Sequence, residues 1–166
     1  MSSDRPTLLS RRASLLGLLA FAGCGLTPIY GTGGQAQVLR NAVAFTSPNT
    51  VEGFRLRERL EERLGRASEP RFDLSVTMSK DAAPATITPE GDITRFNING
   101  TAEWALSDKT GQTLGTGTVS TFTGYSATGS TVATQTAAND AADRVAIALA
   151  DLIAARLILL SSELPQ

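Results

Sequence analysis

Residues 95–106, RFNINGTAEWAL, alternate between polar and apolar side chains. The apolar set is Phe96, Ile98, Ala102, Trp104 and Leu106. Because successive side chains of a β-strand point to opposite faces of a sheet, this pattern predicts a strand with one buried and one polar face. Residues 71–79, RFDLSVTMS, alternate in the same way. Both segments are typical of an antiparallel sheet that is covered on one face only.

A hairpin and a return strand follow directly. The sequence SDKTG at 107–111 provides a glycine that can adopt a positive φ, which favours a tight turn. Residues 112–124 then form a threonine-rich strand whose alternation is broken. The break indicates a β-bulge near Gly115 or Gly117.

The segment 51–64 changes to a helical period. Leu56, Leu60 and Leu64 recur every four residues among charged side chains. The pattern predicts a helix with one narrow apolar stripe, which residues 47–50 can cap and Gly65 can end. Its surface spacing predicts two ion pairs, Arg57 with Glu61 and Arg59 with Glu62.

A long helix is predicted from Thr131 or Val132 to Leu160. Its apolar stripe on a regular helical wheel is Ala138, Ala142, Val145, Leu149, Leu152, Ile153 and Leu160. Ile147 and Ile158 fall on the opposite, charged side. They are either isolated exposed isoleucines or contacts for a protein partner, and we treat both as candidate partner-binding residues.

The first strand is expected to begin near Val38, where Leu39, Val43 and Phe45 alternate with less apolar residues. The order of elements is then β-α-β-β-β-α. The predicted fold class is α+β, a two-layer sandwich in which two helices pack on one face of a four-stranded, mostly antiparallel sheet. The expected folded domain is 38–166.

The N-terminal residues resemble an export signal. Arg5, Arg11 and Arg12 precede an apolar run that is too short to span a membrane, and small residues lead to Cys24, as in a bacterial lipobox. We expect 1–23 to be a lipoprotein signal peptide, Cys24 to be lipidated and 24–37 to be a tether. The alternative is a buried free cysteine, and general or twin-arginine export both stay open.

Composition excludes several functions. The chain of 166 residues has one cysteine, no histidine and a formal charge of −1, so it lacks Ser-His-Asp chemistry and a basic field for nucleic acid. We predict no metal, no cofactor and no enzyme. A hydrolase could use only carboxylates, and nothing in the sequence fixes a catalytic pair among them. These carboxylates are Asp73, Asp81, Glu90, Asp92 and Glu103.

Several segments together resemble the LptE family of lipopolysaccharide-assembly lipoproteins. The most specific is CGLTPIYG at 24–31. The others are the helix from Arg55 to Gly65, the hairpin at 106–111, and the alanine-rich last helix with DAADR at 140–144. The resemblance spans nearly the whole chain after the signal peptide.

The resemblance implies a non-catalytic lipoprotein, anchored by lipid on the periplasmic side of the outer membrane. Its partners would be an LptD-like β-barrel, which it plugs and helps to assemble, and lipopolysaccharide, which the pair transports. A polar strand surface suits a polar barrel interior. The alternative is an auxiliary periplasmic lipoprotein of another envelope transporter or of a barrel-assembly complex.

Binding of lipopolysaccharide phosphates would need local cations. Lys80 and Arg95 flank the predicted loop between the second and third strands, and Lys109 lies at the next hairpin. In a meander these two sites lie at opposite ends of the sheet. Ordinary solvated charges are the alternative interpretation.

Overall fold

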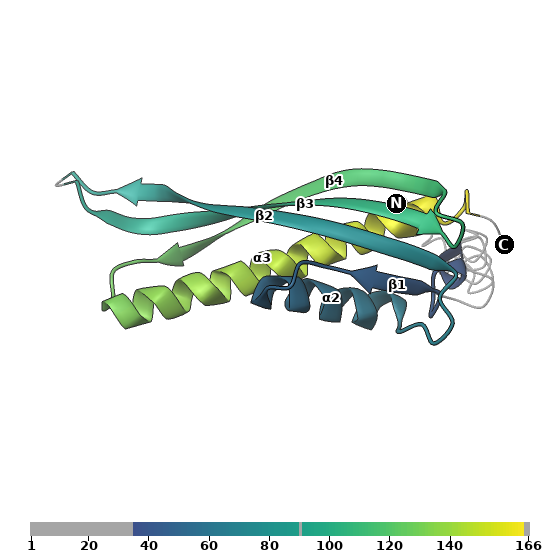
Figure 1. Cartoon of the computed structure of the whole chain (residues 1–166). Coiled ribbons are helices and arrows are strands. Elements are labelled where there is room, and N and C mark those ends of the chain that lie inside the picture. Colours follow the sequence, from purple (N-terminus) through teal and green to yellow (C-terminus); the bar gives the residue numbers. More distant parts are fainter. Residues whose placement is uncertain (1–34, 90, 165–166) are drawn as a thin grey trace, which may run out of the picture.

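The computed structural model describes residues 35–89 and 91–164. Its elements are η1 (Gln35–Val38), β1 (Val43–Thr46), α2 (Val51–Leu64), β2 (Phe72–Ile87), β3 (Ile93–Asp108), β4 (Thr113–Ser126) and α3 (Thr131–Leu160). Both α-helices lie on one side of the sheet (Figure 1). The predicted α+β sandwich with the order β-α-β-β-β-α is confirmed.

The four strands lie in the order β1-β2-β3-β4. β1 runs parallel to β2, with Val43 opposite Phe72, because α2 carries the chain back to the start of the sheet before β2 begins. The other neighbours are antiparallel hairpins. The sheet is therefore mostly antiparallel, as predicted.

α2 begins and ends where its sequence signals lie. The Thr50 hydroxyl accepts a hydrogen bond from the Gly53 amide at 3.1 Å, and Gly65 has a φ of 81° and donates its amide to the Glu61 carbonyl. A positive φ of this kind suits a glycine that ends a helix. The apolar stripe Leu56, Leu60 and Leu64 is buried.

The predicted start of the first strand is wrong. Residues 35–38 form the short helix η1, Asn41 takes a positive φ of 54° in the turn that follows, and β1 begins only at Val43. Leu39 is fully buried although it lies outside a strand. Its apolar side chain therefore extended the alternating pattern beyond the true start of the strand. Ala36 is buried as well, so the predicted tether overlaps the fold at its last residues.

β2 and β3 are longer than the alternation predicted. β2 ends only at Ile87 and β3 already begins at Ile93. The hairpin that they form therefore projects well beyond the part of the sheet on which the helices pack (Figure 1). Pro84 is tolerated there because β1 pairs only with residues 72–75 and leaves the outer edge of β2 free. In β4 the register slips at Leu114, which lies between the partners of Leu106 and Ser107. This confirms the irregularity expected beside Gly115.

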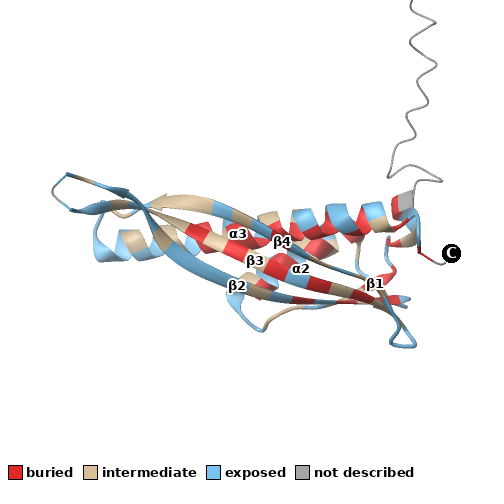
Figure 2. Ribbon diagram, turned by 90° about the horizontal axis from the view of Figure 1, so that it is seen from above, coloured by how far each residue is buried: buried red, intermediate tan, exposed pale blue. Residues whose placement is uncertain are grey.

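α3 buries a face that turns along its length. Its buried positions repeat every four residues in two columns, Ala141, Val145, Leu149, Ile153 and Leu157 in one, and Ala142, Ala146, Ala150, Ala154 and Ile158 in the other. A period of four drifts against the 3.6 residues of a helical turn, by about 40° at each step. The helix therefore presents one side near its middle and another near its end. Figure 2 shows that the buried positions recur along α3.

This rotation corrects two assignments. Ile158, predicted on the exposed charged side, is only 8% exposed, while Leu152, predicted in the apolar stripe, is 41% exposed. A single helical wheel assumes one fixed partner direction over 30 residues, and the actual direction changes. Ile158 thus belongs to the core.

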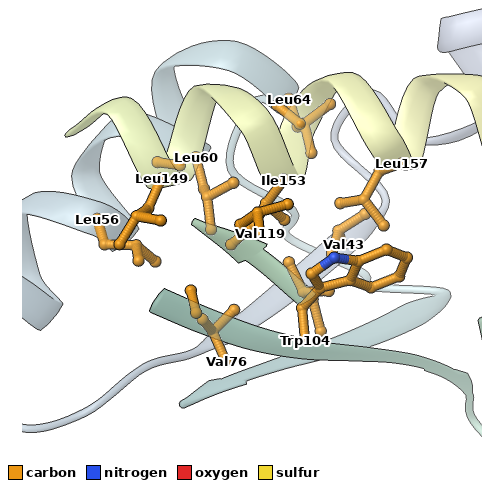
Figure 3. Close-up of a cluster of buried hydrophobic side chains, with 14 of the residues drawn as sticks. Val43, Leu56, Leu60, Leu64, Val76, Trp104, Val119, Leu149, Ile153 and Leu157 are labelled. Atoms are coloured by element: carbon orange, nitrogen blue, oxygen red, sulfur yellow. The ribbon is translucent and has the colours of Figure 1, made fainter. Parts of the chain in front are cut away.

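The core lies between both helices and the part of the sheet that contains β1, the start of β2 and the end of β3. Leu56 and Leu60 of α2 meet Leu149 and Ile153 of α3 above the strands (Figure 3). Gly100 lets α3 approach, since a Cβ there would lie 2.2 Å from Val145 Cγ1. Among the described residues, no helix is long and apolar enough to cross a membrane.

Candidate functional site

One face of the sheet is packed and the other is open. We call the open face the side of β2, β3 and β4 that points away from both helices (Figure 1). Its side chains in the central part of the sheet are small and polar, namely Ser75, Thr77 and Ser79 of β2, Asn97, Asn99 and Thr101 of β3, and Thr116, Thr118 and Ser120 of β4. No described element covers it, so it presents a broad hydroxyl and amide surface.

A single carboxylate lies near the middle of this open face. Glu103 stands opposite Thr77 on one side and Thr118 on the other. It borders two adjoining depressions of ≈ 360 Å³ and ≈ 220 Å³, whose shared residues are Thr77 and Glu103. Within the described part of the chain, Glu103 makes no ion pair or hydrogen bond through its side chain.

The same face carries one large exposed aromatic ring. Phe122 of β4 is 68% exposed and lies opposite Asn99. The broken alternation of residues 112–124 did not assign Phe122 to either face of the sheet. The register between Val119 and Phe122 is regular, so the two side chains point to opposite faces, Val119 into the core and Phe122 away from it.

Lys80 does not flank a loop with Arg95. It lies within β2 opposite Gly100, on the helix-covered face, and binds the carboxylate of Glu52 at the start of α2. This bond holds the pKa of Glu52 below its ordinary value. Arg95 lies on the open face, five residues before Gly100 on β3. At roughly 3.4 Å per residue, it is about 17 Å from Gly100 along the strand. The structure thus separates two cations that the sequence analysis grouped.

Lys109 is also neutralised locally. Its ammonium group lies 2.9 and 3.0 Å from the two carboxylate oxygens of Asp73. The turn beside it is fixed by Asp108, which accepts bonds from the Thr110 hydroxyl and from the amides of Thr110 and Gln112. These bonds, led by that of the Thr110 hydroxyl, lower the pKa of Asp108. Of the three predicted cations, only Arg95 has no carboxylate partner among the described residues.

Ile147 remains at the surface, with 37% of its area exposed. It lies one helical turn from both Asp143 and Asp151, which bind Arg55 at 3.3 Å and Arg59 at 3.0 Å across the seam between the helices. The predicted pairs within α2, Arg57 with Glu61 and Arg59 with Glu62, are confirmed at 2.9 Å each. The pairs between helices carried no local sequence signal, because their members are about 90 residues apart.

The strand carboxylates do not form a catalytic pair. Asp73 and Asp81 each lie four residues along β2 from Thr77, the neighbour of Glu103. Each Cα is therefore roughly 14 Å from the Cα of Glu103, whereas the two carboxyl groups of a glycosidase pair are about 5 to 9.5 Å apart. Asp81 is bound by the Asn99 amide, and Glu90 lies outside the described residues. No cluster of metal-ligating side chains occurs within residues 35–89 and 91–164.

Cys24, the predicted signal peptide and most of the predicted tether lie outside the described residues. Neither Glu103 nor Phe122 of the open face was predicted from the sequence as a binding residue. Glu103 appeared only among possible catalytic carboxylates, although it is the one charged side chain in the middle of a polar strand face. The outward position of Phe122 could have been found by extending strict alternation forward from Val119.

Comparison with known proteins identifies the family. The family model LptE, described as lipopolysaccharide-assembly, matches residues 41–157. A search of curated proteins found no match. Three solved lipoprotein structures share the fold, as follows.

A protein described as a lipoprotein from Caulobacter crescentus CB15 has a TM-score of 0.63 and 20% identity, over 76% of this chain and 96% of that chain. The rare lipoprotein B from Shewanella oneidensis has a TM-score of 0.58 and 12% identity, over 74% and 96%. Lipoprotein B from Nitrosomonas europaea has a TM-score of 0.58 and 10% identity, over 73% and 84%. Since the family model spans α2, the whole sheet and nearly all of α3, the chain belongs to the LptE family of lipopolysaccharide assembly.

Proposed function

We propose that this protein is a non-catalytic lipoprotein of the outer membrane that plugs an LptD-like β-barrel from the periplasmic side. In this role it helps the barrel to assemble and to deliver lipopolysaccharide to the outer leaflet. Family membership supports the place in lipopolysaccharide assembly. Lipidation of Cys24 would hold the protein at the membrane, since several acyl chains give stable anchoring.

The observation that carries the proposal is the open face of the sheet. A monomer normally covers one face of such a sheet and leaves the other to solvent, so polarity alone is ordinary. Here, however, the middle of the open face combines two depressions, the carboxylate of Glu103 and one exposed aromatic ring, and hydroxyl-bearing side chains surround them. A barrel lumen is polar and built of alternating strand residues, so it offers a matching surface.

Lipopolysaccharide contact is a separate part of the proposal. Arg95 is the cation best placed for a phosphate, because Lys80 and Lys109 are already bound to Glu52 and Asp73. Neutralising Arg95 as Arg95→Gln should weaken binding of purified lipopolysaccharide in a salt-sensitive way. Lys109→Gln serves as the matched control and should have a smaller effect.

Co-purification tests the proposed function. The full-length tagged protein, produced with the LptD-like barrel of the same organism, should yield a detergent-resistant complex of the two proteins. The alternative role in another envelope transporter predicts instead an inner-membrane complex that contains an ATPase. Isolation of that complex without the barrel would contradict the proposal.

The lipid anchor is tested independently. Cys24→Ala should leave the domain folded, because the described fold begins near residue 35, but should abolish stable membrane attachment when the barrel is depleted. Membrane fractionation measures this. Continued sedimentation of the Cys24→Ala protein with the outer membrane would show that lipid is not the anchor.

A further inference from the structure

Two residues of the open face have chemistry that the other described residues leave unsatisfied. Within residues 35–89 and 91–164, Glu103 is an exposed carboxylate without a cation partner, and Phe122 is a largely exposed ring without apolar neighbours on its own face. Every other carboxylate on the strand portion of this face has a partner, since Asp73 binds Lys109 and Asp81 binds the Asn99 amide. The open face is therefore not uniformly polar.

The surroundings of Glu103 favour a cation from outside the chain. Its cross-strand neighbours Thr77 and Thr118 are neutral and carry hydroxyl groups. The small side chain of Ala105, two residues along the same strand, leaves room beside the carboxylate in the larger depression. An incoming ammonium or guanidinium group would meet a free carboxylate and hydroxyl acceptors, with no competing cation nearby.

Phe122 supplies a second contact at a fixed spacing. Thr118, the direct partner of Glu103, lies four residues before Phe122 on β4. Glu103 and Phe122 are thus about 14 Å apart, at roughly 3.4 Å per residue along the strand and about 4.8 Å between strands. A wall of antiparallel strands repeats at these same spacings, so it can place two side chains to match both residues. Exposed aromatic rings are frequent binding hot spots when a partner pocket receives them.

We propose that the open face docks on the inner wall of the barrel through these two residues. A Lys or Arg side chain of the wall binds Glu103, and an apolar recess of the wall receives Phe122. The proposal rests on the proposed function, because it takes the barrel as the partner. Beyond the proposed function, the inference names the surface of this protein that meets the barrel wall. It also names the chemistry of the two positions on the wall that contact Glu103 and Phe122.

Co-purification of full-length variants with the barrel tests the proposal. Glu103→Lys places like charges together, and Phe122→Ser removes the ring. Each should reduce recovery of the complex about tenfold or more, and the two together should abolish it. Glu69→Lys and Phe54→Ser are matched controls, because Glu69 is an exposed carboxylate in a loop and Phe54 is a 60% exposed ring on α2. The controls should recover normal amounts of complex.

Two further measurements keep the outcomes distinct. Thermal melting of each isolated variant should match that of the unmodified protein, which shows that a lost complex is not a lost fold. A photoreactive residue at position 103 should crosslink to a lumen-facing segment of the barrel that contains Lys or Arg.

If the unmodified protein does not purify with the barrel, the proposed function fails. If it does, but both variants behave like their controls, only this inference is overturned. Crosslinking from position 103 to lipopolysaccharide rather than to the barrel would also overturn it.

Discussion

The helix-covered face and the open face of the sheet are made by the same three long strands, yet they differ in composition and in packing. On the covered face, Leu74, Trp104 and Leu106 are buried against two helices. On the open face, the same strands present serine, threonine and asparagine, one exposed ring, and the carboxylate of Glu103, which has no partner in the described part of the chain. The comparison separates the residues that determine stability from those available for recognition.

The largest expected effect comes from the centre of the covered face. Leu149 is fully buried between α2 and the sheet, so Leu149→Ala removes packed methyl groups and leaves a cavity. We expect a loss of about 2 to 5 kcal/mol in the free energy of unfolding. Urea denaturation of the isolated domain measures it. A loss below about 1 kcal/mol would mean that α3 is not packed as described.

A smaller effect is expected where α3 approaches the sheet most closely. Gly100→Ala places a Cβ 2.2 Å from Val145 Cγ1, so the helix or the valine must shift. The expected cost is about 1 to 3 kcal/mol. Gly124→Ala is the control, because its nearest neighbour lies at 3.2 Å and belongs to a surface asparagine. Equal costs at the two glycines would contradict the close contact.

The Lys80–Glu52 pair should produce a pH effect confined to the covered face. The pKa of Glu52 is lowered in the folded state, so its contribution is present above the unfolded pKa and is lost as the pH falls through the folded value. The free energy of unfolding should therefore fall less between about pH 5 and pH 3 in Lys80→Met than in the unmodified protein. The difference should be about 1 kcal/mol or less. Chemical denaturation at several pH values measures the difference. An unchanged pH profile would show that Lys80 is not the cause of the lowered pKa of Glu52.

The smallest effect is expected on the open face itself. Thr118→Ala removes an exposed hydroxyl group opposite Glu103 and should change the free energy of unfolding by less than about 0.5 kcal/mol. The same denaturation assay applies. A loss comparable to that at Gly100 would show that the open face contributes to stability, and the contrast between the faces would fail.

Local patterns predicted the secondary structure well. The caps Thr50 and Gly65 delimit α2 where expected, and alternation assigned the covered face of β3 residue by residue. These features depend on neighbours in sequence, so sequence alone contains the information. The resemblance at 24–31 likewise pointed to the family that the match over residues 41–157 then showed.

The remaining predictions were wrong where contacts between distant parts of the chain determine the position of a residue. Ile158 was misplaced because the buried face of α3 turns as it passes over the sheet and α2. Lys80 was placed at a loop because the alanine and proline residues that follow it have low strand propensity, yet pairing with β3 extends β2 to Ile87. The isolation of Glu103 depends on which residues end up beside it, and no local pattern predicts that.

We propose that the open face, rather than the helical side, meets the barrel. The most direct test is the rate of thiol labelling at Thr118→Cys on the open face and at Glu62→Cys on the exposed side of α2, in the isolated protein and in the barrel complex. We expect complex formation to slow labelling at Thr118→Cys much more than at Glu62→Cys. Labelling at Thr118→Cys that is as fast in the complex as in the isolated protein would contradict it.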